Sequence, residues 1–219
     1  VYREGIPPYS RKAAREAKVH TSWLQPQAAY EDALDHFVRG VLDPPRSTAF
    51  AEDLAVLCRA LRWCGGLNSL VLVTLKYTGV GVPDLYQGNE VFDFSLVDPD
   101  NRRPVDYVAR AARLQALDSE QPFMAEGAAG KTVLRPGALD DAKLWICSRL
   151  MALRAAAWPV LRDGGHAPLA VEGPAAHACI AFQRESKAGA LVVVTGRLFA
   201  QRSGAAADPW SDREPRHWD

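Results

Sequence analysis

The first third of the chain carries apolar residues at helical spacing. Two stripes recur every three or four residues, and they are Tyr30, Leu34, Phe37 and Val41, then Phe50, Leu54, Leu57 and Leu61. Each stripe predicts a helix with one buried face. The first helix should open at Pro26 and stop at residues 43–45, where the sequence reads Asp-Pro-Pro. The second should be capped by Ser47 or Thr48 and end at Gly65-Gly66, and a third helix should cover residues 67–77.

Residues 11–18 read as the end of an earlier helix and residues 20–24 as a loop. Residues 80–86 are a short apolar run broken by Gly81 and Pro83, which predicts a buried strand. A polar turn then follows between Pro99 and Pro104, and its carboxylates, amide and guanidinium groups could bind vicinal hydroxyls. The composition fits equally well an Asx-turn that caps the helix beginning near Pro104.

The second half predicts helices followed by strands. Residues 105–117 read as a helix, residues 121–137 as a loop rich in Gly, Ala and Pro, and Asp140 as the cap of a long helix that reaches Trp158. Three segments rich in β-forming residues, 169–171, 178–182 and 190–195, are separated by glycines. They predict a small antiparallel sheet.

The charge balance narrows the function classes. Lys plus Arg and Asp plus Glu both number 26, so the net charge is zero and no footprint for nucleic acid or an anionic membrane is present. No uninterrupted apolar run is long enough to span a bilayer, and no leader opens the chain, so the expected location is cytoplasmic. Four cysteines without a CxxC pair indicate reduced thiols, and the five histidines fall at no zinc-ligand spacing, so no metal is expected.

One segment suggests a different class of protein. Residues 125–132, AEGAAGKT, differ by one residue from a phosphate-binding loop, so Gly130-Lys131-Thr132 raises a remote nucleotide-binding alternative. No strand is predicted before it, and Pro136 lies where the required helix should form.

Two blocks resemble a known family. Residues 81–107, GVPDLYQGNEVFDFSLVDPDNRRPVDY, closely resemble the strand-eight region of maltooligosyl trehalose synthases, members of the alpha-amylase superfamily. Residues 15–23, REAKVHTSW, resemble a second segment of the same enzymes. The resemblance runs from about Lys12 to about Leu198, and the two blocks together are more specific than either alone.

The resemblance implies an α/β fold, namely the C-terminal fragment of a (β/α)8 TIM barrel, with helices plus strand eight, followed by a small, incomplete antiparallel β domain. A complete barrel of this type needs about 250 residues, and this chain has 219. The expected domains are residues 1–118, the C-terminal part of the barrel, 119–158, a linker loop and long helix, and 159–219, the β domain. A partial barrel would expose apolar stripes, so aggregation or dependence on a partner is expected.

The implied activity is that of a (1→4)-alpha-D-glucan 1-alpha-D-glucosylmutase. Such an enzyme converts the reducing-end α-1,4 linkage of a maltooligosaccharide into an α,α-1,1 linkage by retaining intramolecular glucosyl transfer, with no cofactor. Retaining chemistry needs two carboxyl groups about 5 Å apart. In the family these lie upstream of the HTSW block, and no matching segments are found here. The chain alone is therefore expected to be inactive, with no catalytic residue assigned and the N-terminal barrel portion as its partner.

Two loops are implied to bind the sugar near the reducing end. The residues are Lys18, His20, Ser22 and Trp23 on one loop, and Tyr86, Gln87, Glu90, Asp98, Asn101, Arg102 and Arg103 on the other. Flat faces of Trp23 and Tyr86 would cover the apolar side of pyranose rings. The alternatives are plain core packing of these aromatics, a structural role for His20, an orienting role for Glu90, and a non-catalytic glucan-binding or structural fragment.

Overall fold

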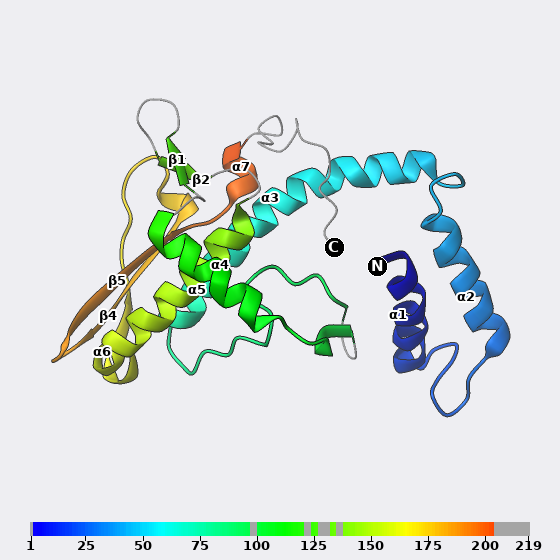
Figure 1. The fold of residues 1–219 in the computed structure, drawn as a ribbon, viewed down its shortest axis with the longest axis horizontal. Coiled ribbons are helices and arrows are strands. Elements are labelled where there is room, and N and C mark those ends of the chain that lie inside the picture. The colour runs from blue at the N-terminus through cyan, green and yellow to red at the C-terminus, as the bar shows by residue number, and fades with distance from the viewer. Residues whose placement is uncertain (1, 97–99, 121–123, 127–131, 135–137, 204–219) are drawn as a thin grey trace. The chain divides into compact units, whose positions relative to one another are not determined.

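The computed structural model describes residues 2–96, 100–120, 124–126, 132–134 and 138–203 (Figure 1). The chain divides into two compact units. Unit 1 contains residues 2–58 with the described parts of 94–104, and unit 2 contains residues 59–93 with the described parts of 105–203. These units rest on spatial contacts, so the domain boundaries expected after residues 118 and 158 remain a prediction.

Unit 1 is built on two helices that pack against each other, α1 (Tyr2–Ala17) and α2 (Ala28–Val41). The predicted helix end, loop and second helix are confirmed, but Pro26 does not open α2. Gln27 is the N-cap, because its carbonyl accepts the first helical bond from the Glu31 N–H at 3.0 Å. A 3-10 turn, η1 (Asp100–Arg102), belongs to the same unit.

The helix α3 (Thr48–Thr78) is continuous over 31 residues, so the predicted break at Gly65-Gly66 is wrong. Glycine costs a helix about 1 kcal/mol but keeps its N–H, so the hydrogen-bond ladder can continue through it. A Cβ added to Gly66 would lie 2.6 Å from Leu139 Cδ1. The glycine therefore allows α3 and α5 to approach closely. At the helix start, the hydroxyls of Ser47 and Thr48 donate back to the carbonyls of Gly40 and Pro44, at 2.9 and 2.8 Å.

The predicted buried strand at residues 80–86 is also wrong. The segment has no regular structure, and Val80 and Val82 are 75% and 94% exposed. A parallel strand needs neighbouring strands to satisfy its backbone groups. In the described part of the chain, long side chains take that role, since Arg154 donates to the Gly81 carbonyl at 2.9 Å and Lys76 to the Asp84 carbonyl at 2.9 Å.

The helical core of unit 2 lies between α3, α4 (Tyr107–Glu120) and α5 (Leu139–Ala156), and a short α6 (Trp158–Asp163) follows. Two clusters of buried residues fill it, Leu117, Ala138, Ala142 and Leu144, then Val73, Tyr77 and Cys147. The helices after residues 105 and 140 are confirmed, but Asp140 is not the N-cap of α5. Ala138 holds that position, and Asp140 Oδ1 accepts the Phe92 N–H at 2.7 Å.

The segment expected to be a loop contains a short hairpin of β1 (Met124–Glu126) and β2 (Thr132–Leu134). Thr132 therefore begins a strand, where a phosphate-binding loop would begin a helix. Gly130 and Lys131 lie outside the described residues.

A three-stranded antiparallel sheet in the order β3-β4-β5 completes unit 2. Its strands are β3 (Gly165–Pro168), β4 (Cys179–Ser186) and β5 (Gly189–Gly196), flanked by η3 (Ala176–Ala178) and α7 (Phe199–Ser203). The last two predicted strands are confirmed. The first lies earlier than residues 169–171, although the Leu169 N–H still reaches the Ala181 carbonyl at 2.9 Å. The described fold is thus helical with a small antiparallel sheet.

Arg184 ties this sheet to the helices. It is 2% exposed, and its donors reach five carbonyls. These acceptors are Gly165 at 3.1 Å, Thr78 at 3.3 Å, Gly79 at 2.9 Å, Leu161 at 2.8 Å and Gly164 at 2.8 Å. Four of the five lie at the C-terminal ends of α3 and α6, where unsatisfied carbonyls favour a cation. All five N–H groups of the guanidinium are thereby used.

Exposed apolar side chains run along α3. Leu54, Leu57 and Leu61 are 41%, 56% and 57% exposed. Among the described residues, α3 is long and apolar enough, by length and composition alone, to cross a bilayer, and little of its apolar part is buried. The sequence expectation concerned uninterrupted apolar runs, and length and composition alone do not test it.

Candidate functional site

The loop between α1 and α2 carries four of the predicted site residues. Lys18 ends α1 in the left-handed region, with φ of 56°, and is exposed. The His20 ring lies 5.0 Å from the Tyr30 ring, which gives this histidine a structural contact. Ser22 closes a tight turn, because its Oγ accepts the Gln25 N–H at 3.0 Å. Trp23 lies in this turn and is 55% exposed.

A buried carboxylate organises the base of this loop. Glu31 is 5% exposed and accepts two hydrogen bonds from Arg15, at 2.8 Å from Nε and 2.6 Å from Nη2. The Thr21 hydroxyl donates a third at 2.6 Å, and the same hydroxyl oxygen accepts the Gln27 N–H at 3.0 Å. The hydrogen bonds from Arg15 and then Thr21 lower the pKa of Glu31 from 4.5 to about 2. Glu31 is therefore a charged, fully engaged group at neutral pH.

Arg15 connects this carboxylate to the predicted aromatic platform. Its guanidinium carbon lies 4.9 Å from the centre of the Trp23 ring, a cation–π distance. One face of the indole is thus covered by a cation that two hydrogen bonds hold in place.

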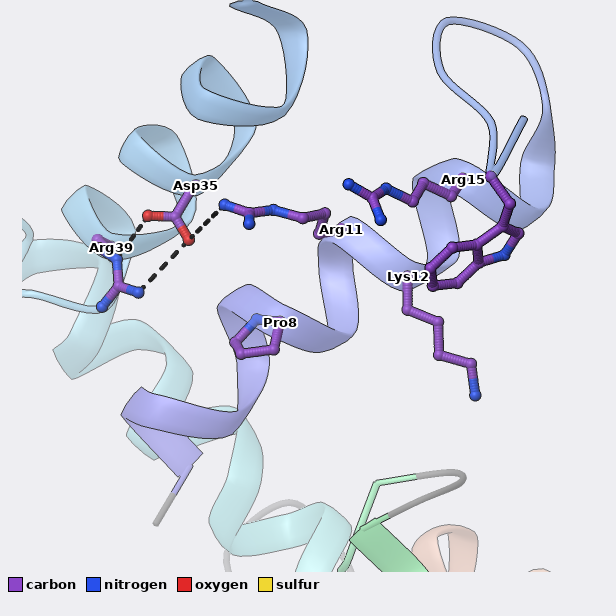
Figure 2. A pocket seen from close by; sticks show the side chains of 7 residues that line it. Pro8, Arg11, Lys12, Arg15, Asp35 and Arg39 are labelled. Atoms are coloured by element: carbon purple, nitrogen blue, oxygen red, sulfur yellow. Dashed lines mark hydrogen bonds and ion pairs between the residues drawn. The ribbon is translucent and has the colours of Figure 1, made fainter. Parts of the chain in front are cut away.

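A hollow of about 210 Å³ opens beside this group, between α1 and α2 (Figure 2). Its lining residues are Pro8, Arg11, Lys12, Arg15, Trp23, Asp35 and Arg39. Asp35 pairs with Arg39 at 2.6 Å and lies 3.8 Å from Arg11. An aromatic wall beside many N–H donors and a carboxylate is suited to a ligand rich in hydroxyls.

The sequence reasoning found Trp23 but missed the charged residues around it. Their signal was present, because Arg11 and Arg15 are four residues apart on α1, and Glu31, Asp35 and Arg39 are four apart on α2. Side chains four residues apart share one helix face. A basic stripe on one helix and a mainly acidic stripe on the next could therefore have indicated a shared ion-pair surface.

The predicted polar turn is held by its own carboxylate. Asp100 Oδ2 accepts the Leu96 N–H at 2.6 Å, and Arg103 Nε donates to the Asp100 carbonyl at 3.0 Å. The side-chain oxygen of Asn101 is buried and has no hydrogen-bond partner among the described residues. Arg102 is exposed, and Asp98 lies outside the described residues. The cap of α4 is Asp106, whose Oδ1 accepts the Ala109 N–H at 2.8 Å.

The remaining predicted residues lie in unit 2, on the segment after α3. Tyr86 is 44% exposed and Gln87 is exposed. Gly88 has φ of 91°, which suits a tight turn that only glycine adopts readily. Arg110 Nη1 donates to the Gly88 carbonyl at 2.7 Å and to Glu90 Oε1 at 2.5 Å. Glu90 therefore forms an ion pair with Arg110. Whether Glu90 orients neighbouring groups or binds sugar remains a prediction.

The predicted residues thus form three local groups, residues 18–23 and 101–103 in unit 1 and residues 86–90 in unit 2. The placement of all three around one sugar remains a prediction. Among the described residues, no group of His, Cys, Asp and Glu side chains could hold a metal ion.

A buried lysine, Lys143, contacts the two residues that follow the group at residues 86–90. Lys143 is 6% exposed, donates to the Val91 carbonyl at 3.0 Å, and lies 4.7 Å from the centre of the Phe92 ring. Burial lowers the pKa of Lys143, and burial raises the pKa of the neighbouring Asp140. Both side chains bind backbone groups of residues 91 and 92, so their role is to fix that segment.

Comparison with known proteins places these features in context. No family model matches the chain. Proteins assigned as maltooligosyl trehalose synthases in two strains of Mycobacterium tuberculosis, CDC 1551 and H37Rv, are 36% identical over 176 residues. The match covers 80% of this chain and 20% of those proteins.

Solved structures agree with the sequence match. The maltooligosyltrehalose synthase from Arthrobacter ramosus is 31% identical with a TM-score of 0.72, over 96% of this chain and 25% of that one. A Sulfolobus tokodaii structure described as a hypothetical maltooligosyl trehalose synthase has 26% identity and a TM-score of 0.62, over 89% of this chain and 24% of that one. This chain therefore spans about a fifth to a quarter of the length of the relatives it matches.

Proposed function

Because this chain is a homologue of the maltooligosyl trehalose synthases over 80% of its length, we propose that it forms part of a (1→4)-alpha-D-glucan 1-alpha-D-glucosylmutase. The substrate is a maltooligosaccharide, and the reaction moves its reducing-end linkage from α-1,4 to α,α-1,1 with retention. The observation that carries the proposal is the agreement of two comparisons, 36% identity in sequence and a TM-score of 0.72 in fold.

In this role the chain contributes sugar-binding loops. Trp23 supplies a half-exposed aromatic face beside a hollow rich in N–H donors. Tyr86 supplies a second exposed ring. These groups suit the two surfaces of a pyranose, whose C–H face is apolar and whose edge carries hydroxyls.

The chemistry itself needs a second polypeptide segment. Retaining transfer requires a carboxylate nucleophile and a carboxylic acid flanking the scissile bond. Glu31 and Glu90 are each held by an arginine in a structural contact, so neither is assigned a catalytic role. The partner is the barrel portion that family members carry and that this chain does not match.

A chimera tests the proposal. The matching quarter of the Arthrobacter ramosus enzyme is replaced by this chain, and conversion of maltoheptaose is followed as loss of reducing ends. The chimera should convert the substrate, and the chain alone should not. An inactive chimera that folds with a native circular dichroism spectrum would contradict the proposal, and activity of the isolated chain would contradict the assignment of the chemistry elsewhere.

A glucan-binding module without catalysis is the second candidate, favoured by the hollow beside Trp23 within a single unit. Calorimetric titration of the isolated chain with maltoheptaose distinguishes the two. Binding by the chain together with an inactive chimera would favour this module over the mutase.

A further inference from the structure

Trp23 is connected to a buried carboxylate through one other side chain. Glu31 binds Arg15, and Arg15 covers one face of the Trp23 indole. The indole lies in an exposed turn, where a tryptophan side chain would ordinarily sample several rotamers. Here the guanidinium of Arg15 covers one of its faces at 4.9 Å. The ring therefore has one occupied face and is still 55% exposed.

Arg15 can serve as a support because it is fixed in turn. Its fork makes two hydrogen bonds to Glu31, at 2.8 and 2.6 Å, a geometry that sets the plane of the guanidinium as well as its position. Glu31 is held by the Thr21 hydroxyl at 2.6 Å, and Thr21 lies two residues before Trp23. Elements α1, α2 and the loop between them are thus joined at one carboxylate.

The neighbouring cation, Arg11, is not held by Glu31 in the same way. Arg11 is 3.9 Å from Glu31 at its nearest pair of atoms, beyond hydrogen-bond distance, and its side chain is 41% exposed. Loss of Glu31 would remove both hydrogen bonds that hold the Arg15 guanidinium, and Arg15 could then leave the indole face.

We propose that Glu31, acting through Arg15 and Thr21, holds the indole of Trp23 in the orientation that receives a pyranose ring. Glu31, Arg15 and Thr21 are then positioning residues of the glucan site, and Trp23 is the residue that touches the sugar. This inference rests on the proposed function for its ligand, but the positioning itself is measurable without one.

The experiment follows the Trp23 indole N–H resonance in the nitrogen-15-labelled chain, assigned with Trp23→Phe. In Glu31→Gln, the resonance should shift and broaden in the absence of ligand. The Kd for maltoheptaose should rise about tenfold, as the loss of a hydrogen-bonded, oriented contact predicts. In the chimera, KM should rise with little change in kcat, because the variant alters binding of the sugar and not the chemistry.

A matched control is available in unit 2. Arg162 binds Asp163 with the same forked geometry, at 2.8 and 2.6 Å, and both side chains are more than half exposed. Asp163→Asn should leave the Trp23 resonance, Kd and KM unchanged. If Glu31→Gln does not fold, Thr21→Val and Thr21→Ser replace it, and only the valine variant, which lacks the hydroxyl, should alter the resonance and weaken binding.

Different outcomes would overturn the positioning role of Glu31 and the proposed function of the chain. A Trp23 resonance and a Kd in folded Glu31→Gln that match those of Asp163→Asn would overturn the positioning role. Absence of maltoheptaose binding by the wild-type chain and the wild-type chimera would overturn the proposed function, while the ligand-free Trp23 resonance would still decide whether Glu31 positions the ring.

Discussion

At the scale of the residue, arginine side chains donate hydrogen bonds to backbone carbonyls that neighbouring strands would bind in a larger sheet. Arg184, Arg154 and Arg110 together donate to carbonyls at the end of α3, in the segment that follows it, and around α6. Each carbonyl would otherwise need water or a neighbouring strand. The irregular course of residues 79–90 is therefore determined by side-chain donors.

Replacement of Arg184 should expose this dependence. Arg184→Met removes five hydrogen bonds, two of them buried and three partly buried, so the free energy of unfolding should fall by about 3 kcal/mol or more. Arg184→Lys should recover only part of this, because an ammonium has three donors and no planar fork. Urea unfolding gives both values, with exposed Arg162→Met as a control expected to change stability by less than about 0.5 kcal/mol. A loss for Arg184→Met no larger than for the control would show that these carbonyls need no partner.

At the scale of the element, two adjacent glycines in α3 have different surroundings. A Cβ on Gly66 would meet Leu139 Cδ1 at 2.6 Å, whereas a Cβ on Gly65 would have nothing within 4 Å. Alanine favours a helix over glycine by about 1 kcal/mol at either position.

The two alanine variants should therefore differ in sign. Gly65→Ala should stabilise the chain by about 0.5 to 1 kcal/mol, since it gains helix propensity without a clash. Gly66→Ala should destabilise it, because overpacking costs about 1 to 3 kcal/mol against that gain. Thermal unfolding followed by circular dichroism measures both. Equal stabilisation by the two variants would mean that α3 and α5 do not pack closely at Gly66.

At the scale of the whole molecule, the feature that needs a cover is the exposed apolar face of α3. Leu54, Leu57 and Leu61 stand three or four residues apart, so they share one face. Contiguous exposed apolar surface is uncommon on soluble monomers and marks an interface. The expected cover is the barrel portion of the proposed enzyme.

Lysines placed on this face of α3 should have different effects in the isolated chain and in the chimera. The double variant Leu57→Lys, Leu61→Lys should reduce self-association of the isolated chain in analytical ultracentrifugation, because it removes exposed apolar surface. In the chimera the same variant should lower the melting temperature, since two lysines would be buried without partners. The pair Val192→Lys, Val194→Lys on the exposed side of β5 gives a comparison elsewhere on the chain. An unchanged chimera would indicate that α3 is not covered there, and flotation with lipid vesicles would show whether a bilayer covers it instead.

The sequence alone predicted helices that begin near residues 26, 48, 105 and 140, the last two strands, and the resemblance to the synthase family. These rest on local information, that is, periodic apolar positions and short motifs. The resemblance also implied that Trp23 is a sugar-binding aromatic. The ring is half exposed and lines a hollow, and its contact with sugar remains a prediction.

The tertiary structure decided the features that depend on contacts between residues far apart in the sequence. Gly65-Gly66 continues a helix because glycine keeps its backbone N–H, and Leu139 packs where a side chain of residue 66 would lie. Residues 80–86 form no strand, and side-chain donors bind the carbonyls of Gly81 and Asp84. The Glu31, Arg15 and Trp23 contacts join residues up to 16 positions apart. The spacing of these residues indicates charged helix faces, but which side chains meet depends on how the two helices pack, and the folded chain shows that.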